Sequence, residues 1–446
     1  MIALSRRSFL ASSVAIAAQP ALAIPASSGV DVIIVGAGAA GIAAARRIVA
    51  ARRKLVVFEA TDRVGGRCFT DTRTFGIPYD RGAHWIHTPD TNPVAKLGLK
   101  AGLGIYAAPP SQRLRIGLGN GITRYARDGE MEDFFANLVR CRRAIDSAAR
   151  GQTDVPGGRV LPKDLGDWRA TMEFMLGPFG CGKGIDEVSA LDLARSADRE
   201  VNAFCREGVG TLLAKLADGL PIQLSRPVKT VDWGGRWIEV QFPRGDLRAR
   251  AVIITPSTAV LAAGKIRFDP ELPRRYVEAI GGLGLGSYDH VAIEFAGNPL
   301  GLDGDDLVFE KATSQRTAAL LANLSGSKLC FVELAGKLGA DLAEEGEAAM
   351  VAFALDWLAS LYGPAVKQAV KRTHATRWNK EPWVLGAASA AAPSGQWARR
   401  ALAEPLRERL WFAGEAVHET LWGTVGGAWE AGERAAEAVL KKLARE

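Results

Sequence analysis

The sequence predicts an α/β fold that begins with a Rossmann-like unit. Residues 31–35 of the 446-residue chain are apolar and indicate a buried strand, and residues 55–58 indicate a second one. Residues 42–51 between them have helical composition. A second strand, turn and helix close the chain, with the strand in LWFAGE and the helix over residues 426–440. Strands that alternate with helices in this way are typical of a parallel sheet covered by helices.

The glycine-rich turn after the first strand predicts a dinucleotide site. Gly36, Gly38 and Gly41 have the spacing GxGxxG. In this motif the first glycine permits a tight turn, the second lets the backbone approach a pyrophosphate, and the third lets helix and strand pack closely. Ala39 and Ala40 lie at the start of the helix, whose N-terminal amides favour phosphate groups.

Two features after the second strand extend this prediction. Glu59 follows Gly36 by 23 residues, where an acidic side chain accepts hydrogen bonds from an adenosine ribose. Up to this point NAD and FAD both fit. Gly65, Gly66 and Arg67 then combine a close backbone approach with a fixed cation near a diphosphate.

Both ends of the chain resemble one family. GAGAAG, Glu59 and VGGR together resemble the opening of the flavin-containing amine oxidases, which include monoamine, polyamine and L-amino-acid oxidases and a histone demethylase branch. The ending, with FAGE, GTVGGA and EAGERAA, is similar to the closing segment of that family. The resemblance implies that Gly414 and Glu415 bind the ribityl and pyrophosphate region of FAD. It also implies that Thr424 and Val425 meet the isoalloxazine.

Internal stretches agree with this resemblance. RGAHWIH, with His84 and Trp85, resembles the loop beside the flavin ring. EGVGTLLAKLADGLPIQLSRPVKTVDW resembles the stretch whose valine, here Val228, packs on the adenine end. ARAVIITPSTAV is similar to the strand and turn that close this half of the cofactor domain.

The order of these stretches implies a discontinuous, Rossmann-like FAD-binding domain and an α+β substrate domain with a helical insert. We expect the FAD-binding domain to comprise residues 30–95, 205–265 and 405–446. The substrate domain is expected to comprise residues 96–204, rich in helices, and residues 266–404.

The first departure from the family pattern concerns the chemistry beside the flavin. The family removes a hydride from the carbon next to an amine, with flavin N5 as acceptor, and the imine then hydrolyses. Many members hold a water near N5 with a lysine, and GSYDHVAIEF places His290 there. A histidine can hold a water or accept a proton, or it can point elsewhere at the end of a strand. HVAIEF itself predicts a strand, and residues 344–361 predict a helix.

The second departure concerns the walls around the amine. Amine-selective members flank the flavin with two aromatic side chains, whereas the corresponding positions here are Ala388 and Thr424. Trp383 and Trp422 lie nearby in sequence and either refill this space or pack elsewhere. We therefore expect His290 and Thr424 to face the reacting centre, and Ala388 and Trp422 to line the substrate cavity. No cysteine lies near Ala388, so we expect non-covalent FAD.

These observations predict a flavin-dependent amine oxidase or amine dehydrogenase with a small-molecule amine or amino-acid substrate. Electrons would pass to O2, giving H2O2, or to an electron carrier. A tryptophan 2-monooxygenase or L-amino-acid oxidase stays open, because no arginine is assigned to a substrate carboxylate by spacing. A flavoprotein desaturase or oxidase acting on C–C bonds also stays open, as does a protein that holds FAD without catalysis.

The N-terminus predicts export. Arg6 and Arg7 precede an apolar run over residues 9–18, and Ala21-Leu22-Ala23 suits cleavage after Ala23. This layout is that of a twin-arginine signal peptide over residues 1–23, which directs a folded protein to the periplasm. The apolar run is too short for a permanent membrane span. FAD would then be loaded before export.

Composition excludes several other classes. The net charge of +7 is spread along the chain without a dense Lys/Arg run interleaved with aromatics, so we expect no nucleic-acid partner. The five cysteines form no CxxC pair, and the close pair His84 and His87 lacks a metal-binding context. We therefore expect no metal site, and the sequence predicts neither a disulfide pairing nor an oligomeric state.

Overall fold

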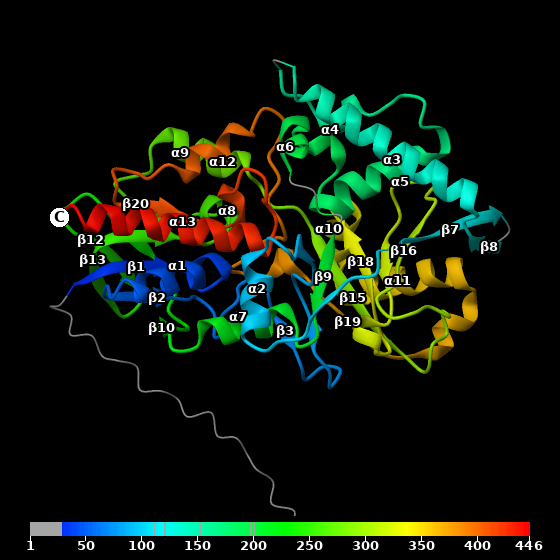
Figure 1. Ribbon diagram of the computed structural model, residues 1–446, viewed down its shortest axis with the longest axis horizontal. Coiled ribbons are helices and arrows are strands. Elements are labelled where there is room, and N and C mark those ends of the chain that lie inside the picture. The colour runs from blue at the N-terminus through cyan, green and yellow to red at the C-terminus, as the bar shows by residue number, and fades with distance from the viewer. Residues whose placement is uncertain (1–28, 111, 120–121, 152, 197–198, 200) are drawn as a thin grey trace, which may run out of the picture.

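Two lobes, each built on a large sheet, make up the computed structural model (Figure 1). It describes residues 29–446 apart from 111, 120–121, 152, 197–198 and 200. The predicted signal peptide, residues 1–23, therefore lies outside the described residues.

The first sheet confirms the predicted Rossmann-like unit. Its parallel part has the order β10-β2-β1-β13, and β20 continues it by pairing with the last residues of β13. Three further strands extend the sheet in the order β12-β11-β14. The strands of this sheet are β1 (Val30–Val35), β2 (Leu55–Phe58), β10 (Ile222–Gln223), β11 (Thr230–Asp232), β12 (Ile238–Phe242), β13 (Gly245–Ile254), β14 (Arg267–Asp269) and β20 (Leu410–Phe412).

Alternate side chains of this sheet enter two cores. Val32 and Ile34 of β1 pack with α1 (Ala39–Ala50) and α13 (Val425–Leu443), which lie side by side (Figure 1, blue and red). Ile33 and Val35 pack on the opposite face. The helices of that opposite face are α8 (Thr258–Ala262), α9 (Arg274–Gly282) and α12 (Trp397–Ala403). On the first face, α1 is flanked by α2 (Pro93–Lys100) and α7 (Val209–Ala217).

The second sheet has the order β19-β15-β18-β17-β16-β7-β8. Its strands are β7 (Gln112–Gly119), β8 (Ile122–Tyr125), β15 (Tyr288–Phe295), β16 (Leu307–Glu310), β17 (Ala319–Leu321), β18 (Leu329–Ala335) and β19 (Val370–Ala375). Strands from both predicted inserts thus share one sheet, and β15 confirms the strand predicted from HVAIEF.

Helices cover both faces of this second sheet. On one side lie α3 (Asp128–Ala148), α4 (Gly157–Val160), α5 (Arg169–Phe174) and α6 (Ala190–Arg195), and on the other α10 (Gly336–Glu345) and α11 (Glu347–Tyr362). A π-helical turn, η2 (Met175–Phe179), continues α5. The remaining strands form two small sheets, β3 (Thr70–Asp71) with β4 (Tyr79–Asp80), and β9 (Asn202–Cys205) with β5 (Ile86–His87) and β6 (Ile105–Ala107).

The structure differs from the sequence-based predictions at four points. The helix predicted over residues 344–361 is interrupted at Gly346, whose φ of +114° belongs to a region that favours glycine. Helix α1 begins at Ala39, before the predicted start, and α13 continues to Leu443. Strand β14 lies just beyond the predicted domain boundary at residue 265, and the boundaries themselves stay a prediction.

Three further findings concern the described residues as a whole. No helix among them is long and apolar enough to cross a membrane. The cysteines are all buried and unpaired. Within the same ranges, no cluster of three or more His, Cys, Asp or Glu side chains is arranged to hold a metal ion.

The packing of α13 on α1 gives a testable prediction. A Cβ at Gly432 would overlap the backbone oxygen of Ala40, so Gly432→Ala must push the two helices apart. We expect the free energy of unfolding to fall by about 1–3 kcal/mol, measured by urea denaturation with circular dichroism. Gly129→Ala on α3, where the new Cβ would meet nothing within 4 Å, is the matched control and should not destabilise. Equal stability of the two variants would contradict this packing.

Candidate active site

One cavity of about 940 Å³ contains the predicted site. It extends from the glycine-rich turn at the start of α1 to β15 and η2 of the second lobe. Of the residues that the sequence assigns to cofactor, catalysis or substrate, its walls include Gly36, Gly38, Ala39, Ala40, Glu59, Gly65, Gly66, Arg67, His84, Trp85, Val228, His290, Trp383, Ala388, Gly414, Glu415, Trp422, Thr424 and Val425. The fold thus brings distant stretches of the chain together around one cavity. The role of each residue stays a prediction unless the hydrogen bonds and ion pairs described below decide it.

Gly41 is the assigned residue that does not line the cavity. A Cβ at this position would overlap the carbonyl oxygen of Gly36. Gly41 therefore acts through packing, by letting α1 lie directly against the turn that follows β1, as the motif predicts.

The cavity end at α1 fits a diphosphate. Gly38 is the N-cap of α1 without a side-chain cap, so the amides of the first turn meet the cavity with the positive end of the helix dipole. The loop of Gly65 lies against this turn, because the Gly65 N–H donates to the Ala37 carbonyl oxygen at 2.9 Å. A side chain at Gly65 would overlap the Cys68 carbonyl oxygen, and its φ is +98°. Two backbone loops with little side-chain bulk therefore form the cradle.

Glu59 is fixed at the end of β2, on the wall of this cradle. Its buried carboxylate accepts hydrogen bonds from the Ala37 N–H at 2.8 Å and from the N–H and hydroxyl of Thr61 at 2.9 and 2.8 Å. These donors hold the carboxylate where the predicted ribose contact would be made.

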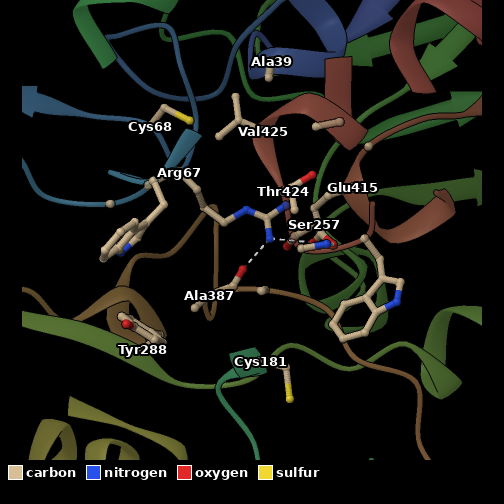
Figure 2. Close-up of a pocket in the computed structure, with 18 of the residues that line it drawn as sticks. Ala39, Arg67, Cys68, Cys181, Ser257, Tyr288, Ala387, Glu415, Thr424 and Val425 are labelled. Carbon is tan, nitrogen blue, oxygen red and sulfur yellow. Dashed lines mark hydrogen bonds and ion pairs between the residues drawn. The ribbon is translucent and has the colours of Figure 1, made fainter. Parts of the chain in front are cut away.

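An ion pair between the partly buried Arg67 and the buried Glu415 joins the N-terminal loop to the C-terminal segment (Figure 2). Arg67 Nη1 donates to Glu415 Oε1 at 2.8 Å and also to the carbonyl oxygen of Ala387. The Glu415 carboxylate accepts further hydrogen bonds from the Ser389 hydroxyl at 2.6 Å and the Gly423 N–H at 2.8 Å. Burial opposes ionisation of Glu415, but the charge of Arg67 and the Ser389 hydrogen bond hold its pKa below the ordinary value. Arg67 is thus a fixed cation, as predicted, but its partners in the structure are protein groups.

A second ion pair, which the sequence did not reveal, extends this network. The guanidinium of Arg399 is fully buried and donates from Nε and Nη2 to the two carboxylate oxygens of Asp192, each at 2.7 Å. Its Nη1 donates to Ser389 Oγ at 3.1 Å and to the Ala416 carbonyl oxygen at 2.9 Å. Because Asp192 lies on α6, the network ties the first insert to the cofactor segment.

The other end of the cavity forms an apolar chamber with a small wall. Met175, Leu176 and Phe179 of η2 line it together with Tyr288 of β15. The small wall is formed by Ala388 and Gly423, since a Cβ at Gly423 would lie 3.2 Å from that of Ala388. Ala388, one of the two positions that are aromatic in amine-selective members, thus contributes only a methyl group to this wall.

The two tryptophans near this wall differ. Trp422 is buried, donates from its indole Nε1 to the Asp192 carbonyl oxygen at 3.3 Å, and lies under the guanidinium of Arg399. It is therefore held by packing, although it reaches the cavity wall. Trp383 also lies on the wall, with the Lys265 ammonium 5.7 Å from its ring centroid.

The position of His290 does not support the predicted role as a water-holding or proton-accepting group. Its Nδ1 lies 2.5 Å from Glu333 Oε2, and its Nε2 lies 2.8 Å from the Gly82 carbonyl oxygen. Both partners are acceptors, so both ring nitrogens carry protons and neither is left for substrate or water. Although burial opposes the charged form, Glu333 raises the pKa of His290 to about 9. His290 is therefore a fixed imidazolium, stacked on Phe331.

Thr424 also lies on the cavity wall, and its hydroxyl is bonded to backbone groups. Its hydroxyl accepts a hydrogen bond from the Gly427 N–H at 2.9 Å and donates to the Leu421 carbonyl oxygen at 2.7 Å. It is the N-cap of α13, so the hydroxyl is used in the cap. Thr424 therefore places the positive end of the α13 dipole at the cavity, and its hydroxyl is not free to react.

Comparison with protein families yields two matches. A model described as flavin containing amine oxidoreductase matches residues 163–440. A model described as NAD(P)-binding Rossmann-like domain matches residues 34–97.

The chain is also similar to individual curated proteins. The chain is 28% identical to lysine-specific histone demethylase 2 of Homo sapiens, over 92% of this chain and 53% of that protein. It is 27% identical to probable polyamine oxidase 4 of Arabidopsis thaliana, over 91% of this chain and 86% of that protein. The chain thus spans about half the length of the histone demethylase.

Solved structures share the fold. Putrescine oxidase bound to putrescine superposes with a TM-score of 0.79 over 92% of this chain and 99% of that one, at 21% identity. Cyclohexylamine oxidase from Brevibacterium oxydans IH-35A gives a TM-score of 0.78 over 94% and 100%, at 22% identity.

The Arg67–Glu415 pair predicts a loss of flavin in Glu415→Gln. Removing the Glu415 charge leaves the partly buried Arg67 without its anionic partner and weakens the hydrogen bonds to this carboxylate, which costs about 1–3 kcal/mol. We expect a lower flavin-to-polypeptide ratio after gel filtration and a lower melting temperature. Glu437→Gln, which breaks an exposed pair between Glu437 of α13 and Arg47 of α1, should change the flavin content and the melting temperature by little. Full flavin retention in Glu415→Gln would contradict this role of the pair.

The His290–Glu333 pair predicts a pH dependence of stability. A histidine with a raised folded-state pKa stabilises the fold fully below its unfolded pKa near 6.5, and this contribution is lost as pH rises through about 9. The free energy of unfolding from urea denaturation should therefore fall between pH 6.5 and 9, on the order of 2 kcal/mol. His290→Gln should remove most of this fall, whereas His418→Gln, whose histidine has a lowered pKa, should keep it. Parallel pH profiles for wild type and His290→Gln would show that the pair is not charged.

Proposed function

Because the chain belongs to the flavin containing amine oxidoreductase family, we propose that it oxidises a small-molecule amine with FAD bound in the cavity described above. The observation that carries this proposal is that a backbone cradle for a diphosphate and an apolar chamber form parts of one cavity. The start of α13 lies at this cavity, through Thr424 and Val425 (Figure 2).

The residues present fit FAD. The first turn of α1 and the loop of Gly65 and Gly66 would hold the diphosphate, Glu59 would meet the ribose, and Val228 the adenine end. FAD bound there would supply the redox chemistry, as acceptor of a hydride from the carbon beside the amine nitrogen; water would hydrolyse the resulting imine, and O2 or an electron carrier would take up the electrons.

The chain's own residues bind and orient the cofactor and the substrate, and they exclude water from the chamber. The apolar side chains of η2 keep the chamber dry, which strengthens electrostatic interactions within it. Ala388 and Gly423 leave room for a substrate beside the start of α13. His290 holds the Gly82 carbonyl oxygen and so supports the loop that carries His84 and Trp85.

We also propose that the protein works in the periplasm. This proposal is supported by Arg6, Arg7, the apolar run and the cleavage pattern at Ala23. A flavoprotein that binds its cofactor before export would need a route for folded proteins, and a periplasmic electron carrier would then be available in place of O2.

Anaerobic titration tests the proposed activity. The purified protein should be yellow, and denaturation should release its FAD, since we expect no covalent link. Under anaerobic conditions at least one compound from a panel of amines and amino acids should bleach the absorbance near 450 nm. Recovery of the absorbance on admitting air would indicate an oxidase, and recovery only with an added carrier would indicate a dehydrogenase. A flavin that no amine or amino acid bleaches would overturn the proposal in favour of C–C oxidation or a non-catalytic role.

Export is tested separately by replacing both arginines of the signal. In a bacterium with a twin-arginine pathway, cell fractionation should find the mature wild-type protein in the periplasm. Arg6→Lys combined with Arg7→Lys should leave the full-length protein in the cytoplasm. Arg46→Lys combined with Arg47→Lys, outside the signal, is the control, and this variant should still reach the periplasm. Equal fractionation of all three proteins would exclude this route.

A further inference from the structure

Arg199 lies in the substrate half of the cavity, beside the small wall. Its Nη1 would be 3.9 Å from a Cβ at Gly423, next to Ala388. Its Nη2 donates to the Trp422 carbonyl oxygen at 2.5 Å, and the guanidinium lies 4.8 Å from the Trp422 ring centroid. These two contacts hold the group in place, while Nε is buried without a hydrogen-bond partner. The guanidinium is thus oriented and incompletely satisfied.

No carboxylate of the described residues forms an ion pair with Arg199. Of the described carboxylates, Glu415 and Asp192 act on it through their charges, but Arg67 and Arg399 respectively already pair with them. Among the described residues of the cavity wall, the other acids are Glu59 in the cradle and Asp146 on α3. Among the residues that the structure describes, the positive charge of Arg199 therefore has no acidic partner beside the small wall.

The two histidines on this wall do not offset the charge of Arg199. His290 is an imidazolium whose charge is balanced by Glu333, as described above. His87, also on the wall, is held neutral, because burial and then the charge of Arg199 lower its pKa to about 4. A second ammonium group, as in a diamine, would be repelled here, whereas a carboxylate would be attracted.

We propose that Arg199 binds the carboxylate of the substrate, so that the amine oxidised by this enzyme is an amino acid. A planar guanidinium with N–H donors to spare matches the geometry of a carboxylate. The position of Arg199 beside Ala388 and Gly423 puts that carboxylate close to the reacting carbon, as in an α-amino acid.

This inference rests on the proposed function and specifies its substrate. The carbon would lose a hydride and the nitrogen a proton, and water would convert the imino acid into a 2-oxo acid and ammonia. The two electrons would leave through the flavin to O2, which becomes H2O2, or to an electron carrier.

Matched substrate pairs test the inference on the wild-type holoenzyme. Phenylalanine and phenethylamine differ by the carboxylate alone, as do tyrosine and tyramine, and putrescine serves as the diamine. We expect at least one amino acid of these pairs to bleach the flavin anaerobically at least 100-fold faster than its amine at equal concentration. Faster bleaching by the amines or by putrescine would overturn the inference and leave amine oxidation standing. If neither these compounds nor any other amine or amino acid bleaches the flavin, the proposed function itself is rejected.

Binding without turnover gives an independent readout. Benzoate, a carboxylate that cannot be oxidised at a C–N bond, should perturb the flavin absorbance of the wild-type protein. We expect Arg199→Met to raise the Kd of benzoate at least tenfold and Arg199→Lys to restore part of the affinity. Arg195→Met, which removes an exposed arginine at the end of α6, is the matched control and should leave the Kd unchanged.

The outcome of the variants decides the assignment in each case. An unchanged Kd for benzoate in Arg199→Met would overturn the role of this residue. Arg199 also supports the backbone at Trp422, so the melting temperature and flavin content of each variant are measured first. If Arg199→Met does not retain flavin, the preference of the wild-type enzyme for the amino acid or the amine of each matched pair decides whether the substrate carries a carboxylate.

Discussion

The active site depends on one buried carboxylate, that of Glu415. Four donors from separate parts of the chain converge on it: the Arg67 guanidinium, the amide and hydroxyl of Ser389, and the Gly423 amide. Through Ser389 it is coupled to the buried Arg399–Asp192 pair. Such a network is stable only when every member is satisfied, so it fixes the loop after β2, the first insert and the C-terminal segment in one arrangement. The cavity lies between these parts, and its shape follows from that arrangement.

Charge divides the cavity into two halves with different tasks. At the cofactor end, backbone amides at the start of α1 supply positive potential where a diphosphate would lie, and Glu59 supplies an acceptor nearby. At the substrate end, apolar side chains of η2 line the wall, and the guanidinium of Arg199 lies beside the small wall. A cation that is already paired, such as Arg67, shapes the site, whereas one with spare donors, such as Arg199, is able to recognise a ligand.

Local patterns in the sequence predicted the parts of the fold that local physics determines. The first strands, the glycine turn and the final helix follow from apolar runs and glycine spacing, and family resemblance placed distant stretches around one cavity. The break at Gly346 follows from a glycine inside a helical pattern, a signal that was present in the sequence. The Asp192–Arg399 pair and the position of Arg199 depend on contacts between residues far apart in the sequence, which no spacing rule encodes. For His290 and Thr424 the location was predicted, but Glu333 and the backbone of α13 determine what their polar atoms do.

The central claim is that one cavity holds the flavin in the glycine cradle and a substrate carboxylate against Arg199. A crystal structure of the FAD-loaded protein with 2-aminobenzoate tests both parts at once. We predict the diphosphate of FAD at the start of α1, the ligand's ring in the apolar chamber, and its carboxylate within hydrogen-bonding distance of the Arg199 guanidinium. A ligand whose carboxylate points away from Arg199, or an FAD diphosphate outside the cradle, would contradict this claim.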